Sequence, residues 1–338
     1  MTTDKNFEHL YCRRPHVVIV GAGASKAVMG DACPTMNGAI EQIGLDKILN
    51  RVKLQTTSKN LEAIYSELFN RGDECKDVRI AMEKALFDYF SNVHLPETLT
   101  IYDLLILSLT NKDCIISFNW DKLLIEAYNR VSGITNNKPE MLFLHGNVGA
   151  GVCEDCMTFG PIQNHCPKCR KPYQQVPLLY PVEKKDYKSN IFIRNQWTVA
   201  KDYISRAGKV TIYGYSAPSS DKEASEILKA SFSKYENVHR LDTVEVIERP
   251  GFNRSEISDT WEYFFSKTNY HQSFEESFFD SSLAKAPRRT IQFQHKQFVE
   301  GWWEEPSIYF TEEDTFNSAA EKLKELLDDE SKGVYSVI

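Results

Sequence analysis

The chain has 338 residues, of which 42% are hydrophobic and 26% are charged, and its formal net charge is −7. These proportions are typical of a folded globular protein and exclude a disordered, collagen-like or disulfide-scaffold protein. The length suits one large domain or two modest ones. The acidic balance, 40 Lys plus Arg against 47 Asp plus Glu, disfavours direct binding of nucleic acid over a broad surface.

Neither the longest apolar runs nor the N-terminus indicates insertion into a membrane or export. The run at 104–109 is far shorter than the roughly 20 residues that a membrane span needs. The segment 1–11 carries Asp4 and Glu8 and has no apolar stretch, so it does not resemble a secretory signal. We therefore expect a cytoplasmic protein with no membrane partner.

Short apolar strands and amphipathic helices alternate along most of the chain. The β-branched run at 16–20 ends at Gly21, which is typical of a buried parallel strand that leads through a tight turn into a helix. Helical spacing at 60–93 predicts helices that cover one face of the sheet. The other expected elements are helices at 101–109 and 220–232 and strands at 114–118, 141–145, 209–213 and 243–248.

Strands that alternate with helices predict an α/β fold, a Rossmann-like parallel sheet with helices on both faces. Ligands of such sheets bind in the crevice beyond the carboxyl ends of the strands. Gly21, Asn119, His145 and Gly214 each follow a predicted strand. We expect these four positions to meet at one crevice.

The chain changes character after residue 250. The stretch 261–310 holds 14 aromatic residues, and 315–327 predicts an amphipathic helix. We expect a main domain over 1–250 and a C-terminal extension over 251–338. The aromatic residues either pack as an additional layer on the sheet or, with Trp302 and Trp303, form an interface for a partner. A third possibility is that 270–279 covers the crevice as a lid.

The segment Gly21-Ala22-Gly23-Ala24-Ser25 follows the first strand directly. Two glycines permit a tight turn and close approach of a phosphate, and the amides of the next helix would supply donors. The dinucleotide fingerprint requires a third glycine where this chain has Lys26, which counts against an ordinary dehydrogenase. The alternative is a turn that merely needs glycine.

Polar residues at two further strand ends are candidates for catalysis. Asn119 and Asp121 follow the strand at 114–118, where an amide could orient a water or hold a ribose hydroxyl. Asp121 could instead cap the next helix. His145 precedes a glycine at another strand end. A lone histidine is usually structural, but its neighbours at the crevice favour a catalytic role.

The cysteines fall into two groups. Two pairs with CxxC spacing, nine residues apart, predict a closed tetrahedral zinc site in a small module inserted at 150–172: Cys153, Cys156, Cys166 and Cys169. Because sulfur fills every position, such a zinc is structural rather than catalytic. The other four are expected to behave as structural, small apolar residues: Cys12, Cys33, Cys75 and Cys114.

In this order, the motifs GAGAS, SFNWD, LHG, two CxxC pairs and IYGYS resemble the sirtuin superfamily, over about 17–248. The resemblance is closer to the divergent bacterial branch associated with NAD hydrolysis in antiphage defence. It implies a sirtuin-like NAD-binding domain with structural zinc and the following contacts. Gly21, Ala22, Gly23 and Ser25 would contact the NAD phosphates, Asn119 and Asp121 the nicotinamide and its ribose, His145 the ribose hydroxyls as general base, and Gly214 and Ser216 the adenosine half.

Two departures from that family disfavour protein deacylation. Deacylating sirtuins carry a Pro-Asp-Phe-Arg segment after the glycine loop, whereas this chain reads DACPTMN at 31–37. After the cysteine module it has VPLLY at 176–180 instead of the Phe-Gly-Glu segment that helps to clamp an acyl-lysine peptide. The predicted function is therefore hydrolysis of NAD to nicotinamide and ADP-ribose or a cyclic relative.

The nicotinamide of NAD leaves as a neutral ring, so the reaction needs no general acid. Asn119 could orient the attacking water and His145 could accept its proton. The resemblance implies a regulated effector in bacterial antiphage defence that forms a homo-oligomer or binds a partner such as an associated ATPase. The alternatives are an NAD-dependent protein deacylase and a non-catalytic sensor of NAD or ADP-ribose.

Overall fold

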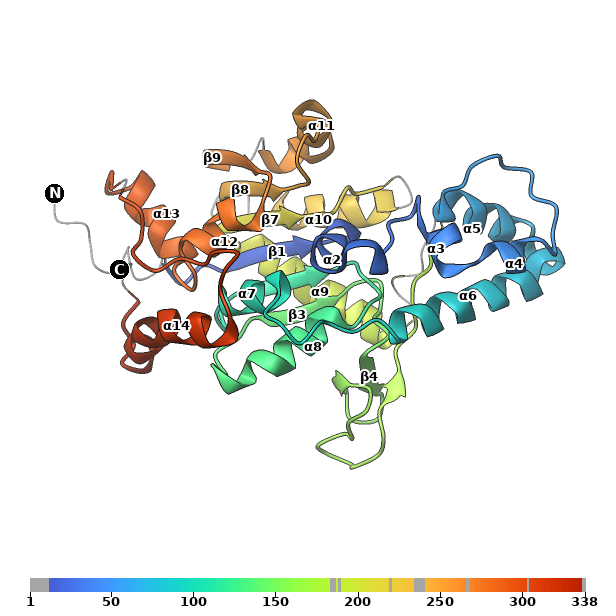
Figure 1. The fold of residues 1–338 in the computed structure, drawn as a ribbon, viewed down its shortest axis with the longest axis horizontal. Helices are drawn as coiled ribbons and strands as arrows, with labels where there is room; N and C mark the ends of the chain where they lie inside the picture. The colour runs from blue at the N-terminus through green and yellow to red at the C-terminus, as the bar shows by residue number, and fades with distance from the viewer. Residues whose placement is uncertain are drawn as a thin grey trace.

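A six-stranded sheet in the order β3-β2-β1-β7-β8-β9 forms the centre of the computed structural model, which describes residues 12–182, 187, 190–218, 221–233, 241–265, 268–302 and 304–335 (Figure 1). Every neighbouring pair of its strands is parallel. The strands are β1 (His16–Val20), β2 (Cys114–Ser117), β3 (Glu140–Phe143), β7 (Lys209–Tyr213), β8 (Leu241–Ile247) and β9 (Thr268–Glu275). The predicted α/β fold is confirmed.

Strand β1 lies where the direction of strand addition reverses, because β2 and β3 lie to one side of it and β7, β8 and β9 to the other. At such a switch point the loops after neighbouring strands diverge and leave a crevice. The continuous apolar run of β1 is explained by its central place, since every residue of the strand is buried. The sequence therefore predicted both the sheet and the position of its crevice.

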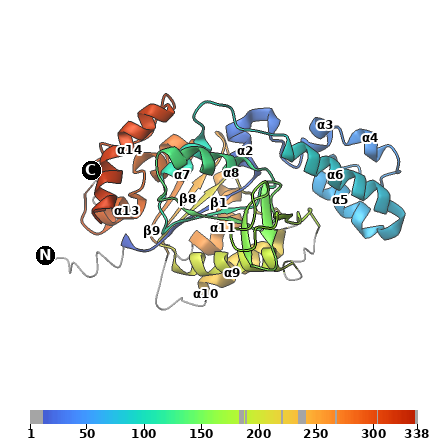
Figure 2. The same ribbon diagram turned by 90° about the horizontal axis from the view of Figure 1, so that it is seen from below.

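Helices cover both faces of the sheet, as predicted (Figure 2). On one face lie α2 (Ala22–Met29), α7 (Ile101–Leu107) and α8 (Leu123–Arg130), and on the other lie α9 (Ile191–Arg206), α10 (Lys222–Ser233) and α11 (Arg254–Phe265). Helix α7 begins at a capping box between Thr100 and Asp103. Among the described residues, no helix is both long and apolar enough to span a bilayer.

The helices within 60–93 do not cover a face of the sheet, contrary to expectation. These two helices, α5 (Leu61–Asn70) and α6 (Lys76–Ser91), form a separate module beside the sheet together with α3 (Ala39–Ile43) and α4 (Asp46–Leu49) (Figure 1). The apolar positions of α6 pack against those of α5 in a hydrophobic cluster distinct from the main core. Helical spacing predicts which side of a helix is buried, but not which partner buries it.

The cysteine-rich segment folds as the predicted inserted module. Its strands β4 (Ala150–Cys153), β5 (Thr158–Pro161) and β6 (Gln174–Gln175) form an antiparallel sheet in the order β5-β4-β6. The apolar cluster inside the module consists of Cys153, Cys166 and Tyr173, with Cys156 and Ile162 packed against it. So small a core indicates that the module needs a further source of stability.

The segment after residue 250 joins the sheet and then covers its side. The idea of a lid at 270–279 is wrong over β9, which is the edge strand of the sheet, although Glu276, Ser277 and Phe278 line the crevice. Trp302 packs against Phe293, which favours the packing interpretation, while Trp303 lies outside the described residues. The domain boundary at residue 250 stays a prediction.

The C-terminal segment also contains the helices α12 (Ser282–Lys285), α13 (Thr290–Phe298) and α14 (Phe316–Ser331). Short 3₁₀ turns lie at Gly30–Ala32, Gly72–Cys75, Val131–Gly133 and Phe278–Asp280.

Candidate active site

A cavity of about 820 Å³ lies beyond the carboxyl ends of the strands. All six strands contribute to its lining through the segments that follow them, and representative residues in sheet order are His145, Asn119, Ala22, Gly214, Glu248 and Glu276. The helical module closes one side with Leu61 and Phe90. The cavity thus lies in the crevice that the sequence predicts beyond the carboxyl ends of the strands.

Two glycine-containing loops pack against each other at the centre of the cavity. The Gly21 amide donates to Tyr213 O (3.0 Å) and the Gly23 amide to Gly214 O (2.9 Å). A Cβ on Gly21 would lie 2.6 Å from Gly214 O, and one on Gly214, whose φ is +60°, would lie 2.3 Å from Ala24 N. The contact between the loops therefore requires glycine at these positions, independently of any ligand.

The side chain of Asn119 is held by oxygens of neighbouring elements. Its Nδ2 donates to Gly21 O (2.9 Å), Ser25 Oγ (2.9 Å) and Tyr102 OH (3.3 Å). The Asn119 backbone amide donates to Ser117 Oγ (3.1 Å). The amide nitrogen is thus committed to the protein, which leaves Oδ1 as the group with which Asn119 can meet a ligand.

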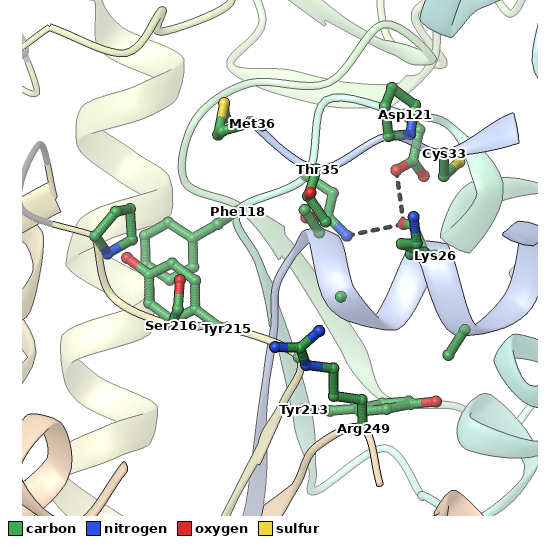
Figure 3. Close-up of a pocket in the computed structure, with 18 of the residues that line it drawn as sticks. Lys26, Cys33, Thr35, Met36, Phe118, Asp121, Tyr213, Tyr215, Ser216 and Arg249 are labelled. Carbon is green, nitrogen blue, oxygen red and sulfur yellow. Dashed lines mark hydrogen bonds between the residues drawn. The ribbon is translucent and has the colours of Figure 1, made fainter. Parts of the chain in front are cut away.

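Asp121 completes this network and also has the capping role weighed from the sequence. Ser25 Oγ donates to Asp121 Oδ2 (2.7 Å), while the Leu123 amide donates to Oδ1 (3.2 Å). Burial raises the pKa of Asp121, and the hydrogen bonds from Ser25 and Leu123 oppose that rise. Figure 3 shows the Asp121 carboxylate turned toward α2, with the hydrogen bond to Ser25 drawn as a dashed line.

His145 follows β3 and is 5% exposed at the edge of the same cavity. Gly146 turns the chain with φ +78°, and the Leu179 amide donates to His145 O (2.9 Å). The imidazole Nε2 lies 3.6 Å from Asp221 Oδ1. The backbone of His145 is therefore fixed, and its ring faces a buried carboxylate.

An aromatic stack links the Asn119 and His145 sides of the cavity. Phe118 stacks face to face on Tyr215, with centroids 4.1 Å apart and planes at 5° (Figure 3). Phe118 also lies edge-on to His145, with ring centroids 4.9 Å apart. Both Asn119 and His145 line the cavity. The two side chains therefore serve one compartment.

The other end of the cavity lies beyond β7, β8 and β9. Gly214 and Ser216 line it together with Glu248 and Arg249, and Figure 3 shows Arg249 beside Tyr213. Lys26, which stands where the dinucleotide fingerprint requires glycine, also lines the cavity. Its Nζ lies 3.5 Å from Asp31 Oδ1. Two positively charged side chains, Lys26 and Arg249, thus line the part of the cavity where an anionic ligand would lie.

Sequence reasoning missed Tyr102 and Asp221. Tyr102 is fully buried in the apolar run of α7, where the sequence predicts only core packing, and its hydroxyl lies 2.7 Å from Ser25 Oγ. Asp221 stands just before helix α10, where an aspartate is typical of a helix start. Only the fold brings either residue to the predicted site.

The four cysteines of the inserted module converge as predicted. The four Sγ atoms lie within 4.8 Å of one another, and Cys153 Sγ is 3.5 Å from Cys169 Sγ. A tetrahedral zinc with Zn–S bonds near 2.3 Å requires sulfurs about 3.8 Å apart, which this spacing fits. None of the eight cysteines, all of them described, forms a disulfide, and Cys33, Cys75 and Cys114 are buried as expected.

In sequence comparisons, no protein-family model and no curated protein matches this chain. Solved structures similar to it include a Sir2 homologue in complex with NAD (13% identity, TM-score 0.40, 87% of this chain and 94% of that one). Another is Sir2 bound to an acetylated peptide (14% identity, TM-score 0.38, 89% and 99%). At these scores the similarity carries no weight for function, which has to be argued from this chain's own residues.

Proposed function

We propose that the chain is an NAD glycohydrolase that cleaves NAD to nicotinamide and ADP-ribose or a cyclic product. The observation that carries this proposal is the shared cavity at the switch point of the sheet. It brings the Asn119 network and His145 to one side and the loops at Gly214 and Glu248 to the other. A dinucleotide needs a site that extends across several strands, with polar groups at its reacting sugar.

The proposed reaction assigns each bond change to a group at the site. The C1′–N bond breaks and its electron pair goes to the nicotinamide ring, while a water oxygen forms the new bond to C1′. Asn119 Oδ1 accepts a hydrogen bond from that water and orients it, and His145 accepts its proton. In a cyclised product, a nucleophile of the ADP-ribose itself replaces the water.

The segment 176–181, here called the strap, favours hydrolysis over deacylation of a protein. The Leu179 amide donates to His145 O (2.9 Å), and Trp120 Nε1 donates to Leu179 O (3.2 Å). Tyr180 stacks on Tyr65 of the helical module, with centroids 5.4 Å apart. Because both backbone groups of Leu179 are already paired within the chain, they are not available to bind a peptide as an added strand.

The structural role proposed for zinc is to hold the inserted module together. The donor set of four sulfurs fits the ion, and it leaves no position for water or substrate. Strand β4 follows the loop after His145, and β6 leads into the strap. We therefore expect the metal to support the site through these two connections and not to take part in the reaction.

We also propose the wider role implied by the motifs, that of a regulated effector in bacterial antiphage defence. A permanently active NAD hydrolase would deplete its own cell, so activity has to await a second copy of the chain, a partner such as an associated ATPase, or another trigger. The measurement is nicotinamide release as a function of protein concentration, with light scattering in parallel. A strict monomer with constant specific activity would contradict control by self-association.

The decisive experiment is chromatography of NAD incubated with the purified chain, beside His145→Ala and Asn119→Ala. Nicotinamide and ADP-ribose should form with the native chain and fall sharply with both variants. The exposed carboxylate of Asp202, which forms a surface salt bridge with Arg206 on α9, offers the control Asp202→Asn. Binding of NAD without release of nicotinamide would instead support a sensor, and release that requires an acetyl-lysine peptide would support a deacylase.

A further inference from the structure

We propose that Lys26 supplies the positive charge that binds the diphosphate of an ADP-containing ligand, and that the diphosphate displaces Asp31 from this lysine. The inference rests on the proposed function and deepens it, because it names the residue that recognises the diphosphate. Lys26 lies on helix α2, directly after the glycine loop, and lines the cavity (Figure 3).

The glycine loop has few backbone donors left for a phosphate. The Gly23 amide donates to Gly214 O (2.9 Å), and the Ala24 amide donates to Gly21 O (3.0 Å). Gly23 and Ala24 belong to the first turn of α2, and amides of a first turn are the usual donors to a phosphate at a helix start. Because these two amides are paired within the chain, the backbone provides only part of the binding that the motif predicts.

The hydroxyl of Ser25 is also committed to the protein. Ser25 Oγ donates its one hydrogen to Asp121 Oδ2 (2.7 Å). It accepts in turn from the Tyr102 hydroxyl (2.7 Å) and from Asn119 Nδ2 (2.9 Å). The serine that the resemblance places at the NAD phosphates therefore has no hydrogen to give to them. A positively charged side chain has to provide the missing interaction.

Two cations are among the described residues that line the cavity, and they follow different strands. Lys26 follows β1, the strand at which the order reverses and beside which the diphosphate of a dinucleotide lies. Arg249 follows β8, which is two strands and thus about 10 Å away. The Arg249 amide donates to Glu248 Oε1 (3.0 Å), and Glu248 also lines the cavity, so a carboxylate accompanies that cation. The sheet order therefore favours Lys26 as the partner of the diphosphate.

The present partner of Lys26 holds it weakly. Lys26 Nζ lies 3.5 Å from Asp31 Oδ1, and the two side chains are 46% and 95% exposed. An ion pair as exposed as this one contributes little to stability. A diphosphate carries more negative charge than one carboxylate and forms strong, charge-assisted hydrogen bonds with an ammonium group. Lys26 can therefore exchange Asp31 for the ligand.

Calorimetric titration with ADP and with adenosine isolates the contribution of the diphosphate. ADP should bind the native chain more tightly than adenosine does. Lys26→Gln should weaken ADP binding by about tenfold, the lower end of the range for a hydrogen bond to a charged group, and adenosine binding by less than about twofold. Added salt should weaken ADP binding to the native chain, and Lys26→Gln should lose most of this dependence.

Three further variants test the assignment. Lys84→Gln removes an exposed lysine that pairs with Asp88 on α6, and it should change neither affinity. Asp31→Asn removes the competitor of the diphosphate, so ADP binding should stay equal or become tighter by up to about fivefold. Weaker ADP binding in Asp31→Asn would contradict the exchange. An ADP affinity within about twofold of the native value in Lys26→Gln, or a loss confined to Arg249→Gln, would overturn the proposal.

These titrations keep the inference distinct from the proposed function, because binding of ADP requires no cleavage. If the native chain leaves NAD intact but binds ADP through Lys26, the proposed function fails and the inference stands. In the active enzyme, Lys26→Gln should raise the KM for NAD by about tenfold and leave kcat within about threefold, since it alters binding and not the reacting sugar. An unchanged KM in a chain that cleaves NAD would overturn the inference alone.

Discussion

The cavity and a buried polar cluster hold nearly the same chemical groups in different surroundings. The cavity has a histidine, a carboxylate and hydroxyls at His145, Asp221 and Ser25. A buried polar cluster below α12 and α13 has the same types at His16, Glu245 and Thr211. The cluster residues do not line the cavity. The types of residue present therefore do not distinguish a functional site from a structural cluster. The hydrogen-bond partners of each side chain have to be compared.

Within the buried polar cluster, the hydrogen bonds form a closed chain. Thr211 has one hydroxyl hydrogen and donates it to Glu245 Oε2 (2.8 Å), so it accepts from His16 Nε2 (2.7 Å). His16 Nδ1 then accepts from the Thr290 hydroxyl (2.9 Å). Both nitrogens of His16 are occupied by protein groups, whereas the ring of His145 borders a cavity. His16 is therefore a structural residue, because the fold uses both of its ring nitrogens.

The largest expected effects come from replacing each histidine in turn. His145→Ala should reduce NAD turnover by about 10²- to 10⁴-fold, the worth of a general base, with little change in melting temperature. His16→Ala should leave kcat within about threefold but lower the free energy of unfolding by about 2–4 kcal/mol. It removes the hydrogen bonds of the imidazole to the Thr211 and Thr290 hydroxyls and opens a cavity. Turnover assays and urea unfolding of both variants measure this. Similar losses of turnover in the two variants would contradict a catalytic role for His145 and a structural role for His16.

The substitution Asn119→Ala should lower both NAD turnover and the free energy of unfolding. It removes the group proposed to orient water, with a similar loss of turnover, and it also deprives Ser25 Oγ and Gly21 O of a donor. A buried acceptor without a donor costs about 1–3 kcal/mol. Nicotinamide release and urea unfolding report the two effects separately. Undiminished turnover in a well-folded variant would contradict the role of Asn119.

Glu245→Gln should destabilise the fold through Lys209 without changing catalysis. Lys209 Nζ lies 3.4 Å from Glu245 Oε1, and both side chains are buried. Removing one charge of a buried pair leaves the other uncompensated, at a cost of about 3–5 kcal/mol. The measurement is urea unfolding, with the double variant Glu245→Gln, Lys209→Met as the matched control. That control should recover most of the loss, and no recovery would assign the effect to the hydrogen bonds of Glu245 instead.

Removal of metal should affect the inserted module and, through it, the site. We expect chelation, or Cys166→Ser, to lower the melting temperature by about 5 °C, since a module with so small a core depends on its ion. NAD turnover should fall partially, because β6 leads into the strap that holds His145 O. Metal analysis of the purified chain provides the control. A zinc-free protein with an unchanged melting temperature would exclude the structural metal.

The sequence predicted the parts of this molecule that depend on local pattern. The β-branched runs at β1 and β7 marked buried strands, and the glycines after them marked loops that require close backbone contact. Helix α9 and edge strand β9 were not predicted. The polar and charged residues of β9, including His271 and Gln272, lack the apolar pattern of a buried strand. Tyr102 and Asp221 reach the site only through tertiary packing, so no local signal marked them.

The smallest predicted effect is a loss of stability in mild acid that originates in the buried polar cluster. Burial, followed by the nearby charges of Lys209 and Lys112, holds the pKa of His16 well below 6.5. The unfolded chain therefore takes up a proton below about pH 6.5 that the folded chain does not, so stability is complete above that pH and falls below it.

The expected slope from His16 is about 1.4 kcal/mol per pH unit. Burial also lowers the pKa of His271, which adds in the same direction, whereas the pKa of Glu245 is lowered from 4.5 and its effect begins only at lower pH. Urea unfolding at pH 7.5 and 5.5 measures the difference. His16→Gln should reduce the slope, because it removes the group that the folded chain holds neutral. Equal slopes in the native chain and His16→Gln would show that His16 is not held neutral by its partners, and the contrast with His145 would lose its physical basis.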